Sequence, residues 1–466
     1  MRERMMDCKP TRRDFVRMAA AAGAGLLAAD ALAQAGTPGA ASAPNLQFAT
    51  PPLERVRVGF VGVGGMGTNH VRNLLRIEGV ELRAVCDIVP EKVANAQNLA
   101  MQAGQPKPAG YTKGEYDFKR MCQEEDLDLV YTATPWEWHA PVCVAAMENG
   151  KHAATEVPAT VTLEECWQLV ETAEKQKKHC VMMENCCYDR PEMMVLNMAR
   201  RGIFGELIHG ECGYLHDLRE LKFATSSEGL WRRAHAVNRD GNLYPTHGIG
   251  PVAQYMNINR GDQFATLVSM SSKSRGLQEF AREHLKDDDP RKQETFKLGD
   301  VNVSLVKTAN GCTITIVHDT NLPRPYSRIN MLQGTRGLFC GYPNRVFIEG
   351  RSKGHEFEEM EAYLKEFDHP LWKANEAAAK GAGHGGMDFI EDMRLIQCLR
   401  HGWPPDMNVY DAAAWTAIGP VSEQSVAKGC APIDFPDFTR GAWKTAPMLD
   451  PVAILDQETM GPRFLA

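Results

Sequence analysis

A glycine-rich turn between an apolar β-type run and a helical stretch constrains the fold of this chain more than any other segment. Residues 56–61 read Val-Arg-Val-Gly-Phe-Val, and residues 62–67 continue as Gly-Val-Gly-Gly-Met-Gly. A second apolar run ends on Asp87, about 20 residues after the last glycine. A strand, a G-x-G-x-x-G turn, a helix and a following acidic residue form the fingerprint of a dinucleotide-binding α/β unit.

Each part of this fingerprint has a physical role. Gly62 permits the tight turn, Gly64 lets the backbone approach a pyrophosphate, and Gly67 lets the helix pack closely on the strand. The free N–H groups at the helix N-terminus then bind the pyrophosphate. Asp87 is predicted to accept hydrogen bonds from the adenosine ribose and to repel a 2′-phosphate, which favours NAD over NADP.

Strands and helices alternate through the first 200 residues. Strands are predicted over 56–61, 82–87, 127–133 and 151–156, and helices through residue 76 and over 91–102, 139–149 and 163–177. This alternation is typical of a doubly wound parallel sheet.

The pattern changes after about residue 200, where short turns join successive strands. Strands are predicted over 207–214, 265–271, 301–306, 313–318, 328–332 and 345–349, with Asn310-Gly311 as a hairpin turn. Helices are predicted over 388–400 and 410–428. The predicted fold is an α/β Rossmann domain over 53–190 and, over 191–466, an α+β domain with a mainly antiparallel open sheet, whose C-terminal helices can pack back on the first domain.

The N-terminus is typical of a targeting segment. Arg12 and Arg13 precede a weakly apolar, Ala- and Gly-rich run that ends near Ala33-Gln34-Ala35. We predict a Tat signal peptide over 1–35 and a flexible lead-in over 36–52, and therefore export by the Tat machinery to the periplasm or the medium. The apolar run is too short and too often interrupted for a stable membrane anchor.

Composition excludes other classes of partner and site. The net charge of −7 and the lack of a Lys/Arg-rich run argue against nucleic acid. The 13 cysteines form no C-x-x-C motif, and no H-E-x-x-H motif occurs, so no metal site is predicted. Buried free thiols are the simpler interpretation, and they suit a protein that folds in a reducing cytoplasm before export.

Six further segments resemble a known family when they are taken together. They are 133–139 (Ala-Thr-Pro-Trp-Glu-Trp-His), 155–159 (Thr-Glu-Val-Pro-Ala), 183–188 (Met-Glu-Asn-Cys-Cys-Tyr), 210–214 (Gly-Glu-Cys-Gly-Tyr), 244–247 (Tyr-Pro-Thr-His) and 323–328 (Pro-Arg-Pro-Tyr-Ser-Arg). The chain resembles the glucose-fructose oxidoreductase/inositol dehydrogenase superfamily and, more closely, glycoside hydrolase family 109, the NAD-dependent α-N-acetylgalactosaminidases.

The resemblance implies roles for individual positions. The residues implied to contact NAD, besides the glycines, are Met66, Gly67, Asp87, Trp136, Glu137, Trp138, His139, Glu156, Val157 and Asn185. Those implied to line the site for an N-acetylgalactosamine-containing glycan are Tyr214, Arg232, Tyr244, Pro245, Thr246, His247 and Tyr326.

One position departs from the superfamily. Its dehydrogenases usually carry Glu-Lys-Pro where this chain has Glu156-Val157-Pro158, and valine cannot transfer a proton. The proton chemistry is therefore assigned to His247 together with Tyr244 or Tyr326. Either tyrosine would act as a base only if a cation such as Arg232 lowered its pKa.

The resemblance implies a cycle of oxidation, elimination, addition and reduction on retained NAD, with no net redox change. Such a cycle suits a protein exported to a place where free NAD is scarce. Two alternatives stay open at this point: a periplasmic NAD(P)-dependent sugar oxidoreductase, and a non-catalytic sugar-binding protein. Val157 is also compatible with lost activity, and the sequence leaves open whether the protein is a monomer or a homo-oligomer.

Overall fold

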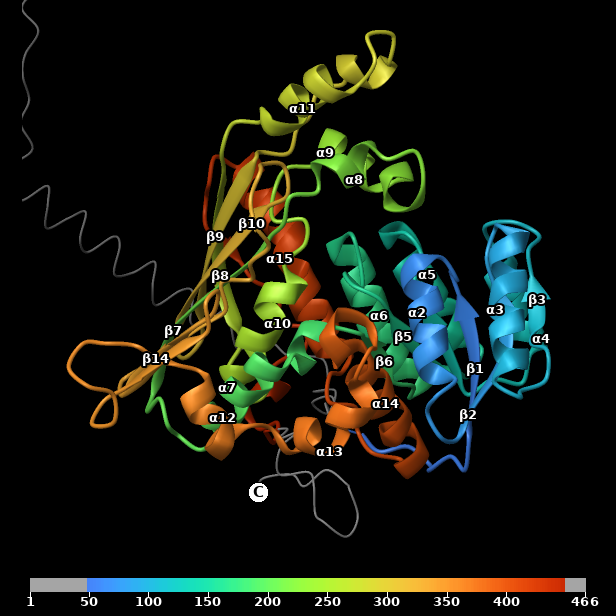
Figure 1. Ribbon diagram of the computed structural model, residues 1–466, viewed down its shortest axis with the longest axis horizontal. Coiled ribbons are helices and arrows are strands. Elements are labelled where there is room, and N and C mark those ends of the chain that lie inside the picture. The colour runs from blue at the N-terminus through green and yellow to red at the C-terminus, as the bar shows by residue number, and fades with distance from the viewer. Residues whose placement is uncertain (1–47, 449–466) are drawn as a thin grey trace, which may run out of the picture. The chain divides into compact units, whose positions relative to one another are not determined.

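A six-stranded parallel sheet forms the first half of the computed structural model, which describes residues 48–448 (Figure 1). The predicted signal peptide and nearly all of the predicted lead-in lie outside the described residues. The strand order is β3-β2-β1-β4-β5-β6. The strands are β1 (Val56–Val61), β2 (Val80–Cys86), β3 (Ala109–Tyr111), β4 (Leu129–Thr132), β5 (His152–Thr155) and β6 (Cys180–Met182).

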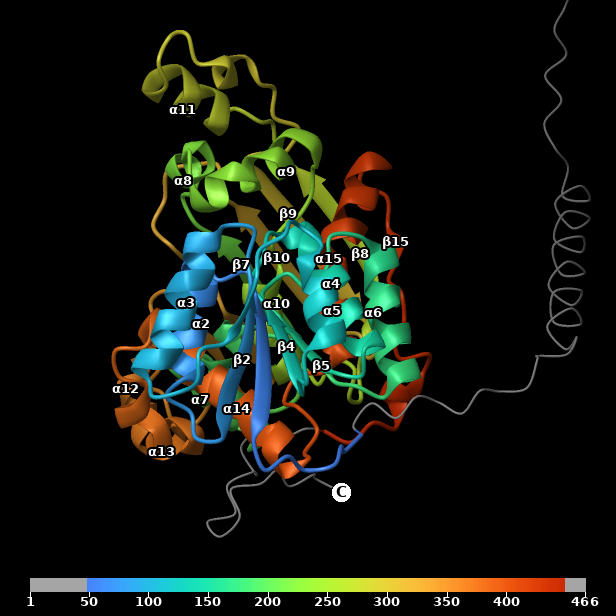
Figure 2. The same cartoon turned by 90° about the vertical axis from the view of Figure 1, so that its right-hand side faces the viewer.

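Helices cover both faces of this sheet, as a doubly wound fold requires (Figure 2). The helices of this half are α2 (Gly65–Leu74), α3 (Pro90–Gln102), α4 (Asp117–Glu124), η1 (Trp136–Trp138), α5 (His139–Glu148), α6 (Leu163–Gln176), η2 (Asn185–Tyr188) and α7 (Arg190–Arg200). The predicted Rossmann fold is confirmed. The sequence did not reveal β3, α4 or β6, because β3 and β6 have only three residues each and α4 only eight.

The second sheet has nine strands in the order β14-β13-β12-β11-β7-β10-β9-β8-β15. The strands are β7 (Leu207–Leu215), β8 (Phe264–Ser271), β9 (Val301–Thr308), β10 (Thr313–Asp319), β11 (Met331–Gly334), β12 (Gly337–Cys340), β13 (Arg345–Ile348), β14 (Glu358–Glu359) and β15 (Ile433–Asp434). Only β7 and β10 pair in parallel among these neighbours, so the mainly antiparallel open sheet is confirmed.

In this sheet the hairpin turn lies where the sequence predicts it, whereas one strand begins later than predicted. Asn310-Gly311 turns the β9–β10 hairpin, and Gly311 takes a φ of +96°. The strand expected over 328–332 begins only at Met331, because Ile329 and Asn330 adopt left-handed backbone angles that a strand does not allow.

The remaining helices lie between and around the sheets. They are α8 (Arg219–Phe223), η3 (Ser227–Leu230), α9 (Arg232–Asn238), α10 (Thr246–Tyr255), α11 (Gly276–His284), η4 (Pro290–Gln293), α12 (Glu361–Phe367), α13 (Pro370–Ala379), η5 (Gly383–Gly386), α14 (Met387–His401), α15 (Val409–Ala427) and η6 (Ala442–Lys444). In Figure 1, α10 and α15 lie between the two sheets.

Helix α15 joins the two sheets. It begins with a capping box in which Asn408 and Asp411 satisfy each other's backbone N–H groups. It packs on β8 of the second sheet and on β6 and α6 of the first. Its residues are apolar on nearly every side, which is typical of a helix buried all round.

Helix α14 packs back on the parallel sheet. Its residues Leu395, Ile396 and Leu399 share one buried cluster with Val58 of β1 and Val71 of α2. The C-terminal part of the chain therefore completes the core on one face of the Rossmann sheet.

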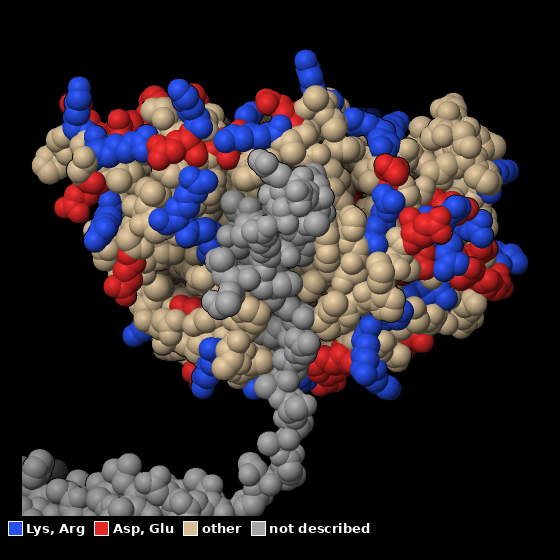
Figure 3. Space-filling view, turned by 90° about the horizontal axis from the view of Figure 1, so that it is seen from below, with Lys and Arg blue, Asp and Glu red and all other residues tan. Residues whose placement is uncertain are grey.

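The surface carries charges of both signs, and the cysteines lie mainly in the interior. On the face shown in Figure 3, acidic and basic side chains are interspersed. Within residues 48–448, no helix has the length and apolarity needed to cross a membrane. The cysteines in that range are all free, and most of them are buried.

Candidate functional site

The glycine-rich turn between β1 and α2 leaves space for a dinucleotide. A Cβ at Gly67 would overlap the carbonyl oxygen of Gly62, so the helix can approach the strand only with glycine there. By contrast, a Cβ at Gly65 would meet nothing within 4 Å, so the first turn of α2 borders open space. Helix N-termini with free N–H groups bind phosphates, and this cradle fits the pyrophosphate of NAD.

Asp87 lies where its predicted role requires, directly after β2. Its Oδ2 accepts a hydrogen bond from the Val63 N–H at 3.0 Å, and its Oδ1 accepts one from the Val89 N–H at 2.9 Å. The carboxylate is thereby fixed beside the glycine-rich turn, and each oxygen keeps a lone pair for a ribose hydroxyl.

Replacing Asp87 with alanine is expected to weaken NAD binding by roughly 1–3 kcal/mol, because hydrogen bonds to a charged group are lost. The preference for NAD over NADP should become smaller, because the variant no longer has the negative charge that repels the 2′-phosphate of NADP. Calorimetric titration of the nucleotide-free protein with each cofactor measures both effects. Unchanged preference for NAD over NADP would remove Asp87 from the ribose site.

The other side of the predicted cofactor site lies at the ends of β4, β5 and β6. Glu156 follows β5, and its Oε1 lies 2.8 Å from His70 Nε2, while its Oε2 accepts from the Val157 N–H at 3.0 Å. Burial opposes the charged form, yet the hydrogen bond and the charge of His70 hold the pKa of Glu156 below its usual value. Glu156 is therefore a fixed carboxylate at the carboxyl edge of the sheet, where dinucleotides bind.

Two of the four residues at 136–139, which the resemblance assigns to NAD, make their contacts within the Rossmann half. His139 is buried, and its two ring nitrogens lie 2.7 Å from the Pro158 carbonyl and 2.8 Å from the Thr134 carbonyl. It therefore ties together the loops after β4 and β5. Trp138 packs edge-on against Tyr116 and Phe118, on the α4 side.

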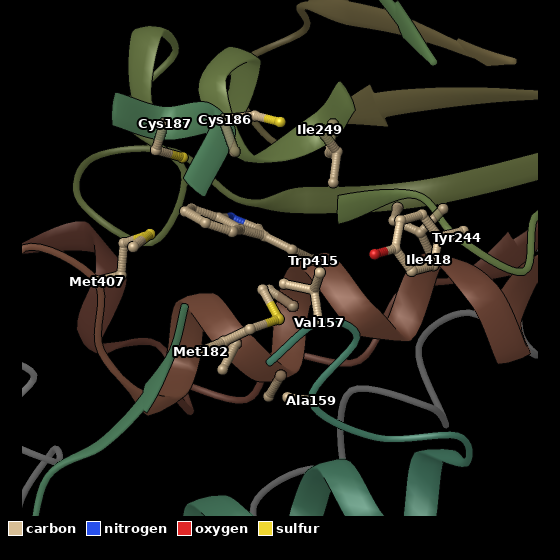
Figure 4. Packing of buried hydrophobic residues seen from close by; sticks show 14 of the residues in the cluster. Val157, Ala159, Met182, Cys186, Cys187, Tyr244, Ile249, Met407, Trp415 and Ile418 are labelled. Atoms are coloured by element: carbon tan, nitrogen blue, oxygen red, sulfur yellow. The ribbon is translucent and has the colours of Figure 1, made fainter. Parts of the chain in front are cut away.

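Val157 lies inside the apolar core. It is 4% exposed and lies in one cluster with Met182, Trp415 and Ile418 (Figure 4). A lysine ammonium in such surroundings would carry a large desolvation cost without a partner. Valine in place of the lysine of Glu-Lys-Pro therefore fits the apolar packing of α15 against this position.

The strongest candidate for proton transfer is a histidine–carboxylate pair. His247 is the second residue of α10, and its Nδ1 lies 2.7 Å from Oε1 of Glu184, which follows β6. Glu184 is fully buried, and its other oxygen has no hydrogen-bond partner among the described residues. A carboxylate at Nδ1 fixes the tautomer of the ring and leaves Nε2 as the basic atom.

Glu184 was not predicted as a site residue, although it stands in a segment that the resemblance matched. Its position in the sequence could have indicated the role, because acidic residues that follow parallel strands lie at the edge of the sheet where ligands bind. Pro245 precedes α10 as its N-cap, and Thr246 is fully buried, so both shape the helix start that holds His247.

Four aromatic side chains continue from His247 and form what we call the aromatic wall: Trp136, Tyr214, Tyr244 and Tyr326. Successive ring centroids lie 5.4 Å (Trp136–Tyr244), 4.6 Å (Tyr244–Tyr214) and 6.1 Å (Tyr214–Tyr326) apart. The Tyr244 hydroxyl is 3.5 Å from His247 Nε2. The fold thus brings the predicted sugar-site tyrosines together beside the histidine.

Arg232 lies against this wall. Its guanidinium is 5.0 Å from the ring centroid of Trp136 and 4.9 Å from that of Tyr244, and it pairs with Glu228 at 3.0 Å. Cation–π contacts of this kind hold both the charge and the rings in place.

The condition under which one of these tyrosines would act as a base, a pKa lowered by Arg232, is not met. Burial raises the pKa of Tyr244 well above its usual value, and the opposing effect of Arg232 is smaller. Burial likewise raises the pKa values of Tyr214 and Tyr326. The tyrosines are therefore neutral phenols, which donate hydrogen bonds and do not act as bases near neutral pH.

A hollow of about 280 Å³ adjoins the aromatic wall. Trp136, Tyr214, Arg232 and Tyr244 line it together with Lys222, which the sequence did not single out. Burial lowers the pKa of Lys222 to about 7, and its ammonium donates to the Asn321 side chain at 2.6 Å. Apolar side chains such as Leu218 and Leu243 make up much of the remaining lining, so Lys222 is a buried amine in a largely apolar hollow.

Comparison with known proteins assigns these features to a family. The family model described as the glycosyl hydrolase 109 C-terminal domain matches residues 188–445. A glycosyl hydrolase family 109 protein of Solibacter usitatus (strain Ellin6076) is 48% identical over 441 residues, which cover 94% of this chain and 99% of that protein. The chain belongs to glycoside hydrolase family 109. A family 109 protein of Shewanella pealeana (strain ATCC 700345 / ANG-SQ1) is 46% identical over 446 residues, covering 94% of this chain and 98% of the relative.

The Rossmann half of this family 109 protein is matched separately. The model described as the oxidoreductase family with an NAD-binding Rossmann fold covers residues 56–184. A levoglucosan dehydrogenase solved with NADH shares 19% identity at a TM-score of 0.64, over 82% of this chain and all of that one. An inositol dehydrogenase homolog from Azotobacter vinelandii, solved with NAD⁺, shares 18% identity at a TM-score of 0.62, over 83% of this chain and 99% of that one.

These matches confirm the family and NAD as the cofactor predicted from the sequence, and the solved structures confirm the fold. The histidine–carboxylate pair spans the two matched parts. Glu184 is the last residue of the Rossmann match, and His247 lies in the family 109 domain. Each half of the chain thus supplies one member of the pair.

Proposed function

We propose that this family 109 protein hydrolyses α-N-acetylgalactosaminides with retained NAD and no net redox change. The observation that carries the proposal is the Glu184–His247 pair, placed between the predicted cofactor site and the aromatic wall. Bound NAD would supply a reversible oxidation at a sugar carbinol carbon, which we assign to C3.

His247 is the residue assigned to the C3 hydroxyl. Because Glu184 occupies the Nδ1 side of the ring, Nε2, which has only a long 3.5 Å contact to the Tyr244 hydroxyl, is the atom assigned to accept the hydroxyl proton and to return it at the end of the cycle. The buried carboxylate stabilises the imidazolium that forms in between. The superfamily lysine, absent at Val157, is not needed for this transfer.

The tyrosines of the aromatic wall are assigned to binding and polarising the sugar. As neutral phenols, Tyr214 and Tyr244 can donate hydrogen bonds to a carbonyl oxygen at C3. Polarising that carbonyl acidifies the C2–H bond, whose loss expels the C1 substituent and leaves an enone. Water then adds at C1, a proton returns to C2, and the C3 alcohol is restored.

Hydrolysis of a chromogenic α-N-acetylgalactosaminide in heavy water is expected to place deuterium at C2 of the released sugar. The reason is that C2–H breaks and re-forms in every turnover. Mass spectrometry and proton NMR of the product measure the incorporation.

The same experiment separates the alternatives. A sugar oxidoreductase would yield an oxidised sugar. A non-catalytic sugar-binding protein would release no product of any kind. A glycosidase with two catalytic carboxylates would release sugar without exchange at C2 and without NAD. Hydrolysis without C2 exchange would contradict the elimination route.

Export by the Tat pathway is part of the proposal, since that route carries folded proteins and so keeps NAD bound. Changing Arg12 and Arg13 to lysine is expected to leave uncleaved precursor inside the cell, because the receptor reads the arginine pair. Fractionation and immunoblotting of the two forms measure this. Normal secretion of the variant would contradict Tat export.

A further inference from the structure

A strained glycine-rich loop leads into helix α14. Its residues His384, Gly385 and Gly386 have φ values of +48°, +73° and +108°. A histidine in the left-handed region is unfavourable, and such outliers persist where the surroundings or a ligand demand them. A Cβ at Gly383 would overlap Asp388 Oδ2, so the loop also lies tightly against the first turn of α14.

A buried carboxylate, that of Asp388, holds the ring of His384 in place. His384 Nδ1 lies 2.8 Å from Oδ2 of Asp388, and Oδ1 of Asp388 accepts from the Asn185 amide at 2.7 Å. The side chain of Asp388 is 1% exposed, whereas that of His384 is 50% exposed. Among the described residues, Nε2 of His384 has no hydrogen-bond partner, so the half-exposed ring keeps one nitrogen available to a ligand.

The position of the His384–Asp388–Asn185 contacts indicates which half of the cofactor they face. Asn185 follows β6, and Glu156 follows β5, both at the carboxyl edge of the parallel sheet. Asp87, at the end of β2, serves the adenosine side. A diphosphate held at α2 would lie between them, and the nicotinamide side would then extend over the ends of β4 to β6.

The charges around His384 agree with this placement. The hydrogen bond to Asp388 raises the pKa of His384, with a further contribution from Glu156. The carboxylate of Asp388 is itself held below its usual pKa, since the hydrogen bond and charge of His384 outweigh burial. The ring is therefore a fixed donor and not a freely rotating surface histidine.

We propose that His384 binds the nicotinamide-ribose half of NAD through Nε2, and that Asp388 positions it. The loop 381–386 is then a segment of the family 109 domain that slows the release of NAD from the Rossmann domain. The proposal rests on NAD binding alone and not on the glycosidase activity proposed above.

The test compares His384→Asn with a matched control, His355→Asn. Asparagine tolerates a left-handed backbone but is too short to reach the same donor position. His355 is an exposed loop histidine outside this cluster. Two quantities are measured: the rate at which NAD bound to the purified holoprotein exchanges with isotopically labelled NAD, and the affinity of the nucleotide-free protein for ADP, which lacks the nicotinamide riboside.

His384→Asn is expected to accelerate NAD exchange about tenfold, the factor that corresponds to about 1.4 kcal/mol. The affinity for ADP should stay unchanged, and His355→Asn should change neither quantity. Asp388→Asn should move NAD exchange in the same direction as His384→Asn. Unchanged NAD exchange would overturn the proposal, and so would an equal loss of ADP affinity, which would place the effect at the diphosphate or in the fold.

Discussion

Alanine in place of His247 is expected to lower the turnover of an α-N-acetylgalactosaminide by about 10²–10⁴-fold, the usual effect of removing a general acid–base. NAD should remain bound, because the glycine-rich turn, Asp87 and Glu156 are untouched. Steady-state kinetics and the nucleotide content of the purified variant measure the two outcomes. Deuterium exchange at C2 should fall with turnover, since the C3 ketone precedes it.

Glu184→Gln is the informative companion variant. Glutamine fits the same buried space and can still accept a hydrogen bond from Nδ1, but it carries no charge to stabilise an imidazolium. Its turnover should lie between those of the wild type and His247→Ala. His209→Ala serves as the control, because His209 bonds Thr313 between β7 and β10 of the second sheet and belongs neither to the histidine–carboxylate pair nor to the aromatic wall. Near-normal turnover of His247→Ala would exclude this histidine as the proton acceptor.

Asparagine in place of Asp406 is expected to destabilise the fold by about 3–5 kcal/mol, the cost of breaking a buried ion pair. Arg394 and Asp406 are each at most 2% exposed and are joined by two hydrogen bonds of 2.8 and 2.9 Å. The variant would leave the guanidinium charge buried and unpaired. Asp406 also accepts from the Tyr188 hydroxyl at 3.0 Å, so it fixes η2, which carries Asn185.

Urea unfolding of the NAD-loaded protein, followed by tryptophan fluorescence, measures the loss. Glu366→Gln is the matched control, because its pair with Arg351 is exposed on both sides and contributes less than about 1 kcal/mol. A loss at Asp406→Asn as small as that of the control would contradict the assignment of Arg394–Asp406 as a stabilising pair.

The elements that the sequence predicted correctly carry local signals. The glycine-rich turn, the hairpin at Asn310-Gly311 and the long helices α14 and α15 each follow from residues within a few positions of one another. Asp87 was found for the same reason, since its distance from the turn is a property of one βαβ unit.

The features that sequence reasoning missed depend on contacts between distant segments. Glu184 becomes a site residue only because α10 brings His247 to it, and His384 matters only because α14 packs beside η2. The protonation state of the tyrosines was left open for a similar reason. The sequence shows the cation Arg232 nearby but not the burial, which has the larger effect on the pKa of Tyr244.

The packing of α14 on the parallel sheet bears on how the protein is made. The N-terminal domain of a chain usually folds first as synthesis proceeds. Here the six strands are complete by residue 182, but one face of their core is closed by a helix that ends at residue 401. The core beneath the nucleotide-binding turn is therefore completed only when most of the chain has left the ribosome. We expect stable retention of the cofactor to be a late step in biosynthesis, and a product truncated before α14 to retain it poorly.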